Sequence, residues 1–158
     1  MKRALAALLL VSAPAAARDA LGIYDGWGAF RDAKPQRCFA IAEPVRAARG
    51  KWRPYASVGH WPMQRIRGQI HIRMSREKRD NAPVTLSIDD RKFALVAGGA
   101  DAWAPDARVD AAIVAAMRSG RSMSIASVSA NGAFADTYRL KGAATAIDAA
   151  ALGCARGR

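Results

Sequence analysis

Residues 84–142 constrain the fold of this chain most, because local signals agree there from residue to residue. Apolar and polar residues alternate over 84–89 and again over 93–96, which predicts two strands joined by a turn at Asp89-Asp90. Asn131-Gly132 is a typical two-residue hairpin turn and predicts a second strand pair. The segment therefore predicts an antiparallel sheet built from hairpins.

One helix is expected between these two strand pairs. Pro105 and Asp106 provide a start signal, apolar residues recur at helical spacing over 109–117, and Gly120 provides a stop. The sequence therefore predicts a helix over about residues 106–119.

The strand that follows this helix, at residues 121–129, contains one irregularity. Met123 and Ile125 are at odd positions, whereas Val128 is at an even one. A β-bulge between Ala126 and Ser127 would return the apolar side chains to one face, so we expect a bulge there.

Asp136 is the acidic residue with the most unusual expected position. By alternation it shares a strand face with Phe134, Tyr138 and Leu140. If this face is the core, the carboxylate is buried and needs a partner such as an arginine or backbone amides. This pattern favours a structural hydrogen-bonding role over a catalytic one, since no second titratable group is placed beside it by the sequence.

The N-terminal segment has the pattern of a secretory signal peptide. Two basic residues precede an apolar run over 4–13, and the small-residue site Ala15-Ala16-Ala17 follows. A membrane anchor would need about 20 apolar residues, and Pro14 interrupts this run. We therefore expect residues 1–17 to be a signal peptide that is cleaved after Ala17, with export to the periplasm or outer envelope. The remaining residues, 18–158, are expected to form a single domain that does not span the membrane.

Cys38 and Cys154 are the two cysteines of the chain. In an oxidising compartment, two lone cysteines most simply pair with each other. A reactive or metal-binding thiol pair is the alternative, but there is no C-x-x-C motif and no histidine near either cysteine. We expect a structural disulfide that ties the two ends of the domain together.

Two more strands are expected before the basic region. Residues 22–30 combine aromatic residues with glycines and predict a first strand, and residues 37–43 predict a second. The aromatic residues of the first strand could form a stacking platform for sugars or bases, although aromatic residues in strands more often belong to the core.

Nearly all of the net positive charge of the expected mature chain lies between residues 46 and 79. Glu77 is the single acidic residue among ten basic ones, and Trp52, Tyr55, His60 and Trp61 are interleaved with them. Within this region, residues 69–73 predict a strand with Ile70 and Ile72 facing inward. The ten basic residues are Arg46, Arg49, Lys51, Arg53, Arg65, Arg67, Arg73, Arg76, Lys78 and Arg79.

Such a basic segment suits a polyanionic partner, namely anionic lipid, lipopolysaccharide or acidic polysaccharide. Nucleic acid is not expected, because export removes the protein from most nucleic acids. The alternative is an ordinary solvated face, since arginine and alanine are frequent throughout the chain. The spacing of the residues selects no particular ligand.

No catalytic or metal-binding motif is present in the sequence. His60 and His71 lack the spacing of metal ligands, and no nucleophile elbow, phosphate loop or dinucleotide turn occurs. We therefore expect no catalytic residues, no metal and no cofactor.

The order of these segments resembles the invasion-associated locus B family of alphaproteobacterial envelope proteins. The resemblance is carried by residues 38–44 (Cys-Phe-Ala-Ile-Ala-Glu-Pro), 93–96, 102–104, 113–120, 127–132, 136–142 (Asp-Thr-Tyr-Arg-Leu-Lys-Gly) and the terminal Cys154. It implies a mainly β fold, an immunoglobulin-like β-sandwich that carries one inserted α-helix and a short C-terminal helix. The family offers no catalytic residues to transfer.

Two functions of different classes follow as hypotheses. The first is an exported, non-enzymatic envelope protein with a structural or binding role, whose basic segment contacts anionic envelope or host-surface material. The alternative is a periplasmic hydrolase that acts on envelope glycan or lipid.

Overall fold

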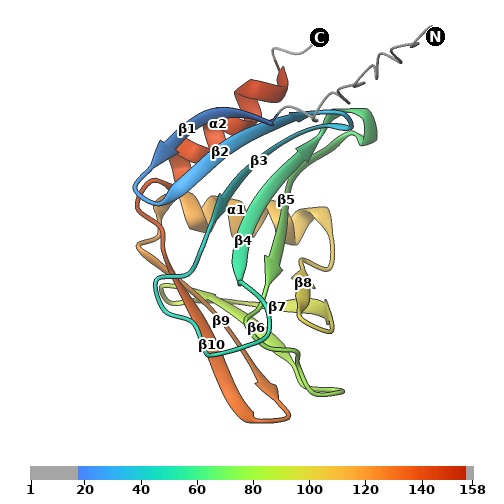
Figure 1. Ribbon diagram of the computed structural model, residues 1–158, viewed down its shortest axis with the longest axis vertical. Coiled ribbons are helices and arrows are strands. Elements are labelled where there is room, and N and C mark those ends of the chain that lie inside the picture. Colours follow the sequence, from blue (N-terminus) through green and yellow to red (C-terminus); the bar gives the residue numbers. More distant parts are fainter. Residues whose placement is uncertain (1–17, 156–158) are drawn as a thin grey trace, which may run out of the picture.

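Ten antiparallel strands join in one sheet, and two α-helices pack against it (Figure 1). The computed structural model describes residues 18–155, so the expected signal peptide lies outside the described residues. The sheet order is β1-β2-β3-β4-β5-β8-β7-β6-β9-β10. The strands are β1 (Arg18–Tyr24), β2 (Trp27–Ala33), β3 (Gln36–Ala42), β4 (Tyr55–Trp61), β5 (Ile66–Arg73), β6 (Val84–Ile88), β7 (Arg91–Gly98), β8 (Asp101–Trp103), β9 (Ser122–Ser129) and β10 (Gly132–Arg139).

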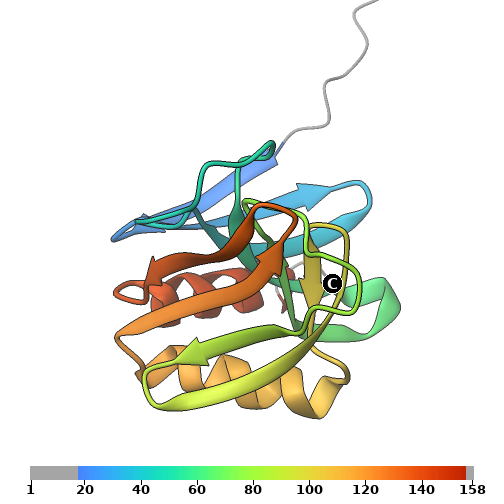
Figure 2. The same cartoon turned by 90° about the horizontal axis from the view of Figure 1, so that it is seen from below.

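The helices are α1 (Ala107–Ser119) and α2 (Ala143–Ala155), and a short 3₁₀ helix, η1 (Pro62–Gln64), connects β4 to β5. The first half of the sheet, β1 to β5, arches in front of both α-helices in Figure 1. Viewed from below, α2 lies between β1–β3 and α1 (Figure 2). The mainly β fold class, with one inserted helix and one C-terminal helix, is confirmed. The expectation that the C-terminal helix is short is wrong, because α2 has 13 residues and is as long as α1.

The two predicted hairpins are present. β6 pairs with β7 through a turn at Asp89-Asp90, and β9 pairs with β10 through the turn before Gly132. The helix between them begins where the sequence predicts, because the Asp106 carboxylate accepts a hydrogen bond from the Val109 amide at 2.8 Å. Gly120 caps its C-terminus.

Residues 22–30 form a hairpin rather than one strand. β1 ends at Tyr24 and β2 begins at Trp27, and the two residues between them, Asp25 and Gly26, have φ angles of 49° and 95°. A two-residue turn with positive φ at both positions suits Asp-Gly, which is itself a strong hairpin signal. The prediction of a single first strand is therefore wrong.

The predicted bulge in β9 is also absent. β9 and β10 pair without a register shift, and the inward positions after Ile125 are occupied by Ser127 and Ser129. Their hydroxyl groups donate hydrogen bonds to the carbonyl oxygens of Pro83 and Gly132, both at 2.9 Å. These bonds satisfy the buried hydroxyls, so the strand keeps its register without an apolar residue at either position.

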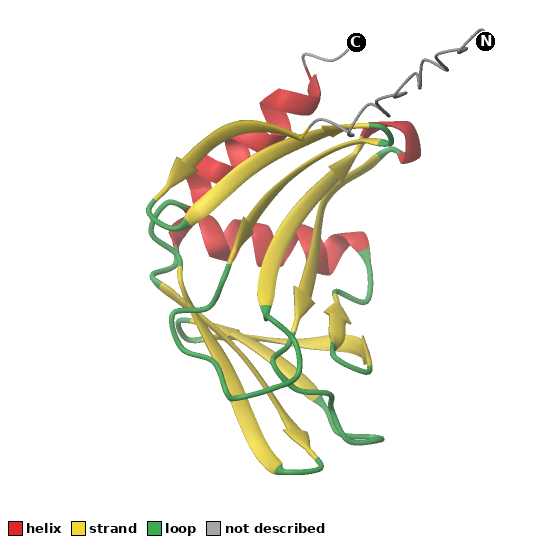
Figure 3. Ribbon diagram, in the orientation of Figure 1, coloured by secondary structure: helices red, strands yellow, loops and turns green. Residues whose placement is uncertain are grey.

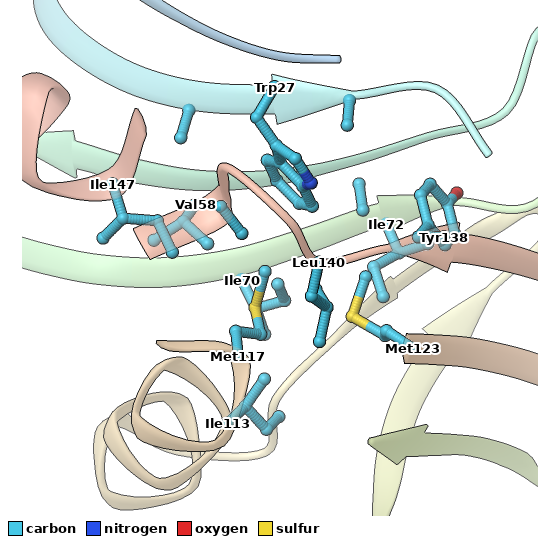
Figure 4. Close-up of a cluster of buried hydrophobic side chains, with 14 of the residues drawn as sticks. Trp27, Val58, Ile70, Ile72, Ile113, Met117, Met123, Tyr138, Leu140 and Ile147 are labelled. Carbon is cyan, nitrogen blue, oxygen red and sulfur yellow. The ribbon is translucent and has the colours of Figure 1, made fainter. Parts of the chain in front are cut away.

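Both halves of the sheet and both helices contribute to one core (Figure 4). Trp27 from the first half is 1% exposed, and its indole nitrogen donates to the Arg139 carbonyl oxygen at 2.9 Å. Ile70 and Ile72 of β5 are fully buried, as the alternation predicts. Trp27 therefore belongs to the core and not to a stacking platform.

The predicted disulfide between Cys38 and Cys154 is present, with Cα atoms 5.7 Å apart. It joins β3 to the last turn of α2 and thereby fixes that helix to the inner face of the first half. Neither helix of residues 18–155 has the length and apolar character needed to cross a bilayer.

Candidate functional site

The ten basic residues of the segment 46–79 lie on two loops and at the two ends of β5. Arg46, Arg49, Lys51 and Arg53 lie on the long loop between β3 and β4, which runs toward β10 in Figure 3. Arg76, Lys78 and Arg79 lie on the loop after β5. Arg65, Arg67 and Arg73 lie at the two ends of β5.

The two loops lie side by side. The Arg76 side chain donates to the Arg49 carbonyl oxygen at 2.8 Å. A Cβ atom at Gly50 would lie 1.5 Å from the Ser75 carbonyl oxygen, so only glycine allows this approach. We call the six basic residues that these loops bring together the basic loop cluster: Arg46, Arg49, Lys51, Arg76, Lys78 and Arg79. Arg53 is excluded because it pairs with Glu43 at 2.5 Å.

Asp136 holds both loops in place. Its fully buried carboxylate accepts hydrogen bonds from the Ser75 amide at 2.7 Å, the Ser75 hydroxyl at 2.6 Å and the Ala48 amide at 3.2 Å. The predicted structural role of Asp136 is thus confirmed, and its partners are amides and a hydroxyl rather than an arginine. The basic loop cluster rests on this anchor.

The remaining basic residues are not part of the cluster. Arg65 and Arg67 lie at the start of β5, and an eight-residue strand spans about 26 Å, so they lie far from the two loops. Arg73, at the other end of β5, forms a bidentate ion pair with Asp101 at 2.8 and 2.9 Å.

Asp101 also binds His71, and this group of side chains was not predicted. The His71 Nε2 atom is 2.8 Å from the Asp101 carboxylate, the Tyr55 hydroxyl is 3.5 Å from His71 Nδ1, and the Trp103 ring stacks on the imidazole with centroids 5.1 Å apart. The residues come from β4, β5 and β8, which are adjacent only in the folded sheet.

Hydrogen bonds and burial shift the pKa values of two groups here, Asp101 and Tyr55. Burial of Asp101 opposes its ionisation, but hydrogen bonds from Arg73 and His71 outweigh burial and lower the pKa of its carboxyl. Burial raises the pKa of the Tyr55 hydroxyl, which therefore stays protonated. Both nitrogens of His71 have a partner in this group, the Asp101 carboxylate at Nε2 and the Tyr55 hydroxyl at Nδ1.

His60 lies on the opposite side of the sheet from His71. It pairs in register with Cys38, whose side chain points toward α2. Burial, together with the nearby Arg67 and Arg118, lowers the pKa of His60. The two histidines therefore cannot share an ion, and no group of metal-ligating side chains occurs within residues 18–155.

A trough runs along β3 and β4 on the face of the first half that is turned away from the helices. It consists of two cavities of about 280 and 260 Å³ that share Ile41 and Tyr55. We call it the outer trough. The first cavity is lined by Ile23, Gly26, Gly28, Phe30, Ile41, Ala42, Glu43, Arg53, Pro54 and Tyr55, and the second by Arg18, Arg37, Phe39, Ile41, Tyr55, Ser57, Gly59, Trp61 and His71.

The trough is hollow because small residues separate large ones along β4. Ser57 and Gly59 point outward between Tyr55 and Trp61, and the Trp61 ring lies over Gly59, where a Cβ atom would be 2.4 Å from it. Glycine at this position therefore lets the tryptophan lie flat on the strand and leaves the space over Ser57 open.

Cations lie over the second cavity. The guanidinium groups of Arg18 and Arg37 lie 5.2 and 5.0 Å from the centroid of the Phe39 ring, and both pair with Asp32 at 2.7 Å. The hydrogen bond from Arg18, reinforced by that from Arg37, lowers the pKa of the Asp32 carboxyl despite its partial burial. Two cations therefore share one carboxylate. The only sequence signal for the outer trough was the group of aromatic residues in its strands. Arg18 and Arg37 lie outside the basic segment 46–79.

Comparisons of the chain with models of protein families, with curated proteins and with solved structures gave no match. The resemblance to the invasion-associated locus B family therefore stays a prediction.

Proposed function

We propose that this chain is an exported, non-enzymatic envelope protein of the type that the invasion-associated locus B resemblance implies, and that it binds anionic envelope material through the basic loop cluster. The disulfide between Cys38 and Cys154 supports export, because such bonds persist in oxidising compartments. A structural role in the envelope and a binding role are compatible.

The observation that carries the binding role is the adjacency of the two basic loops. Arg46, Arg49 and Arg79 are exposed and come from loops that contact each other. The buried carboxylate of Asp136 anchors both loops, so the cations do not depend on mobile segments for their positions. A set of cations on a fixed support loses little conformational freedom when it binds an anionic surface.

Binding to vesicles tests this proposal. We would measure binding to vesicles of phosphatidylglycerol and phosphatidylcholine across a salt series, and compare wild type with the triple variant Arg46→Glu/Arg49→Glu/Arg79→Glu. Each cation near an anionic membrane contributes about 1 kcal/mol, so loss of three predicts a decrease on the order of 100-fold at low salt. Wild-type binding should also fall steeply as salt screens the charges.

The chain provides a matched control for net charge. Arg65→Glu/Arg67→Glu/Arg108→Glu makes the same change in total charge at exposed residues outside the cluster. We expect this variant to bind nearly as wild type does. Equal losses in both variants would show that only net charge matters, and no vesicle binding by wild type at low salt would refute the proposal.

The alternative function, a periplasmic hydrolase, has one observation in its favour. Tyr55, His71 and Asp101 form a hydrogen-bonded chain beside the outer trough. Against it, the carboxylate of Asp101 is already paired with Arg73. A loss of hydrolysis of an envelope glycan or lipid in His71→Gln would favour the hydrolase; absence of any such hydrolysis in wild type would exclude it.

A further inference from the structure

We propose that the outer trough binds a single-chain anionic amphiphile, with its acyl chain in the cavity beside Ile23 and its anionic head beside Arg18 and Arg37. None of the trough residues belongs to the basic loop cluster, so this site does not rest on the function proposed above. The two ends of the trough differ in chemistry, one being apolar and the other positively charged.

The first cavity is apolar and in contact with solvent. Ile23 is 67% exposed, and Phe30, Ile41 and Pro54 complete the apolar wall. The charged side chains at this end, Glu43 and Arg53, pair with each other. A sugar ring would find few hydrogen-bonding partners here, whereas an acyl chain would remove apolar surface from water on both sides.

The second cavity provides the positive charge. Asp32 accepts from Arg18 through Nε and one terminal nitrogen and from Arg37 through Nε, so each guanidinium keeps further N–H donors. The Arg18 and Arg37 side chains are 54% and 39% exposed. A phosphate or carboxylate can therefore accept hydrogen bonds from both arginines without displacing Asp32.

The two cavities adjoin. Ile41 and Tyr55 line both of them, so an acyl chain in the first cavity would reach the second by crossing these two side chains. The outward side of β3 from Ile41 to Arg37 spans about 13 Å at the usual rise per residue. The cavities of about 280 and 260 Å³ are each just below the range of about 300–1,000 Å³ that is usual for small-molecule sites, so the proposed ligand occupies both.

Dodecyl phosphate below its micelle-forming concentration is the probe for this site. We would measure its binding to the purified protein by calorimetry and by tryptophan fluorescence, since Trp61 lines the trough. We expect it to bind on the order of 100-fold more tightly than inorganic phosphate, because the chain buries apolar surface. Neutral dodecyl maltoside should bind more weakly, because it lacks the anionic head.

Two pairs of variants test the two ends separately. Arg37→Gln should weaken binding on the order of tenfold, because a charge-assisted hydrogen bond is lost, whereas Arg91→Gln should not; Arg91 also lies over an aromatic ring, at 5.2 Å from the Phe93 centroid, but in the other half of the sheet. Ile23→Ser should weaken binding about fivefold, and Val96→Ser, at an exposed aliphatic residue of β7, should have no effect.

A third pair tests the trough itself. Ser57→Phe fills its floor and should abolish binding, whereas Ser57→Ala keeps the space and should preserve it. Circular dichroism would verify that each variant is folded. Failure of dodecyl phosphate to bind, equal binding of inorganic phosphate, or equal behaviour of the two members of these pairs would overturn the proposal.

The same variants separate this site from the basic loop cluster and identify the source of the amphiphile. Arg46→Glu/Arg49→Glu/Arg79→Glu should bind dodecyl phosphate as wild type does, even where it no longer binds vesicles; a comparable loss of both would contradict two separate sites. If Ser57→Phe weakens vesicle binding as well as monomer binding, the amphiphile comes from the bilayer. If it weakens monomer binding alone, the amphiphile is a free one.

Discussion

The two halves of the sheet face one core but present different outer surfaces. On β1 to β5 and β8, the outward side chains include Phe30, Tyr55, Trp61, His71 and Trp103, with arginines and carboxylates among them. On β6, β7, β9 and β10 the corresponding positions carry no aromatic residue and are mostly small, with Lys92, Val96, Val128 and Arg139 as the larger side chains. Cross-strand neighbours there are Ala94, Thr85, Ala126 and Ala135 in one row, and Lys92, Ser87, Ser124 and Thr137 in the next.

This difference separates what the fold needs from what a ligand needs. The second half shows that the outer face of this sheet can be made of small side chains. Large aromatic residues stabilise the fold where they pack in a core, because their apolar surface is removed from water. On an outer face they leave apolar surface in water, which is unfavourable. The aromatic residues and paired arginines of the first half are therefore the best evidence for a binding surface on this molecule.

Of the changes considered, removal of the disulfide should alter most the stability of the first half of the sheet relative to the second. Cys38→Ala/Cys154→Ala frees α2 from the first half, and a closed loop of this length predicts a loss of about 4 kcal/mol in the free energy of unfolding. Thermal denaturation would measure the loss. Hydrogen exchange should show that protection falls more in β1–β3 than in β9–β10; a larger fall in β9–β10 would contradict this.

Asp136→Ala should have the next largest effect, because it removes the anchor between the two basic loops and β10. The Ser75 amide, the Ser75 hydroxyl and the Ala48 amide would lose their acceptor in a buried place, which costs about 3 kcal/mol. Urea denaturation would measure the change. Asp110→Asn is the control, because this aspartate accepts only the Ile70 amide and burial already raises the pKa of its carboxyl. An equal loss in both variants would refute the anchor role.

Asp101→Asn, in the first half of the sheet, should lower the free energy of unfolding by a smaller amount that depends on pH. Its pairs with Arg73 and His71 are partly exposed, so we expect a loss of about 1 kcal/mol at pH 7. Because the pKa of Asp101 is lowered in the folded state, its contribution is present above the unfolded value of about 3.9 and disappears as the pH falls through the folded one. Denaturation at pH 7 and pH 2.5 tests this: a difference between wild type and variant that persists at pH 2.5 would count against the ion pair.

Ala126→Lys, on the outer face of the second half, should have the smallest effect. Ala126 is exposed and its cross-strand neighbours are small, so we expect a change within about 0.5 kcal/mol and no change in vesicle or dodecyl phosphate binding. Urea denaturation and gel filtration would check this. A loss above about 1 kcal/mol, or a change in elution, would mean that this face is also covered in solution.

Much of the fold was predictable because its signals are local. The turn at Asp89-Asp90, the turn at Ala130-Asn131, which lies one residue before the predicted Asn131-Gly132, and the helix capped by Asp106 depend on residues that are close in sequence. The hairpin at Asp25-Gly26 was equally local, and aromatic residues on both sides masked its turn signal. The bulge was predicted wrongly because alternation records apolar side chains only, whereas Ser127 and Ser129 are buried with hydrogen-bonded hydroxyls.

The candidate sites were much less predictable. The positive charge of residues 46–79 was evident from the sequence. The sequence could not show that Arg49 belongs to the basic loop cluster and Arg65 does not, because this depends on the path of the chain after β5, which brings Arg76 beside Arg49. The outer trough was even harder to predict from the sequence, since Arg18 and Arg37 lie outside that segment. Their shared partner Asp32 becomes visible only when β1, β2 and β3 are paired.

The sequence by itself determined most of the strands but not β4 and β8, together with the inserted helix, the inward side of most strands and the pairing of Cys38 with Cys154. Each of these depends on a period, a turn dipeptide or a count, which are properties of neighbouring residues or of composition. Only the tertiary structure decided which outward side chains become neighbours. Strand order joins β5 to β8 and thereby places His71 on Asp101, and the pairing of β3 with β4 leaves Ser57 open between Ile41, Tyr55 and Trp61, because hydrogen bonding between strands brings together residues that the chain itself keeps far apart.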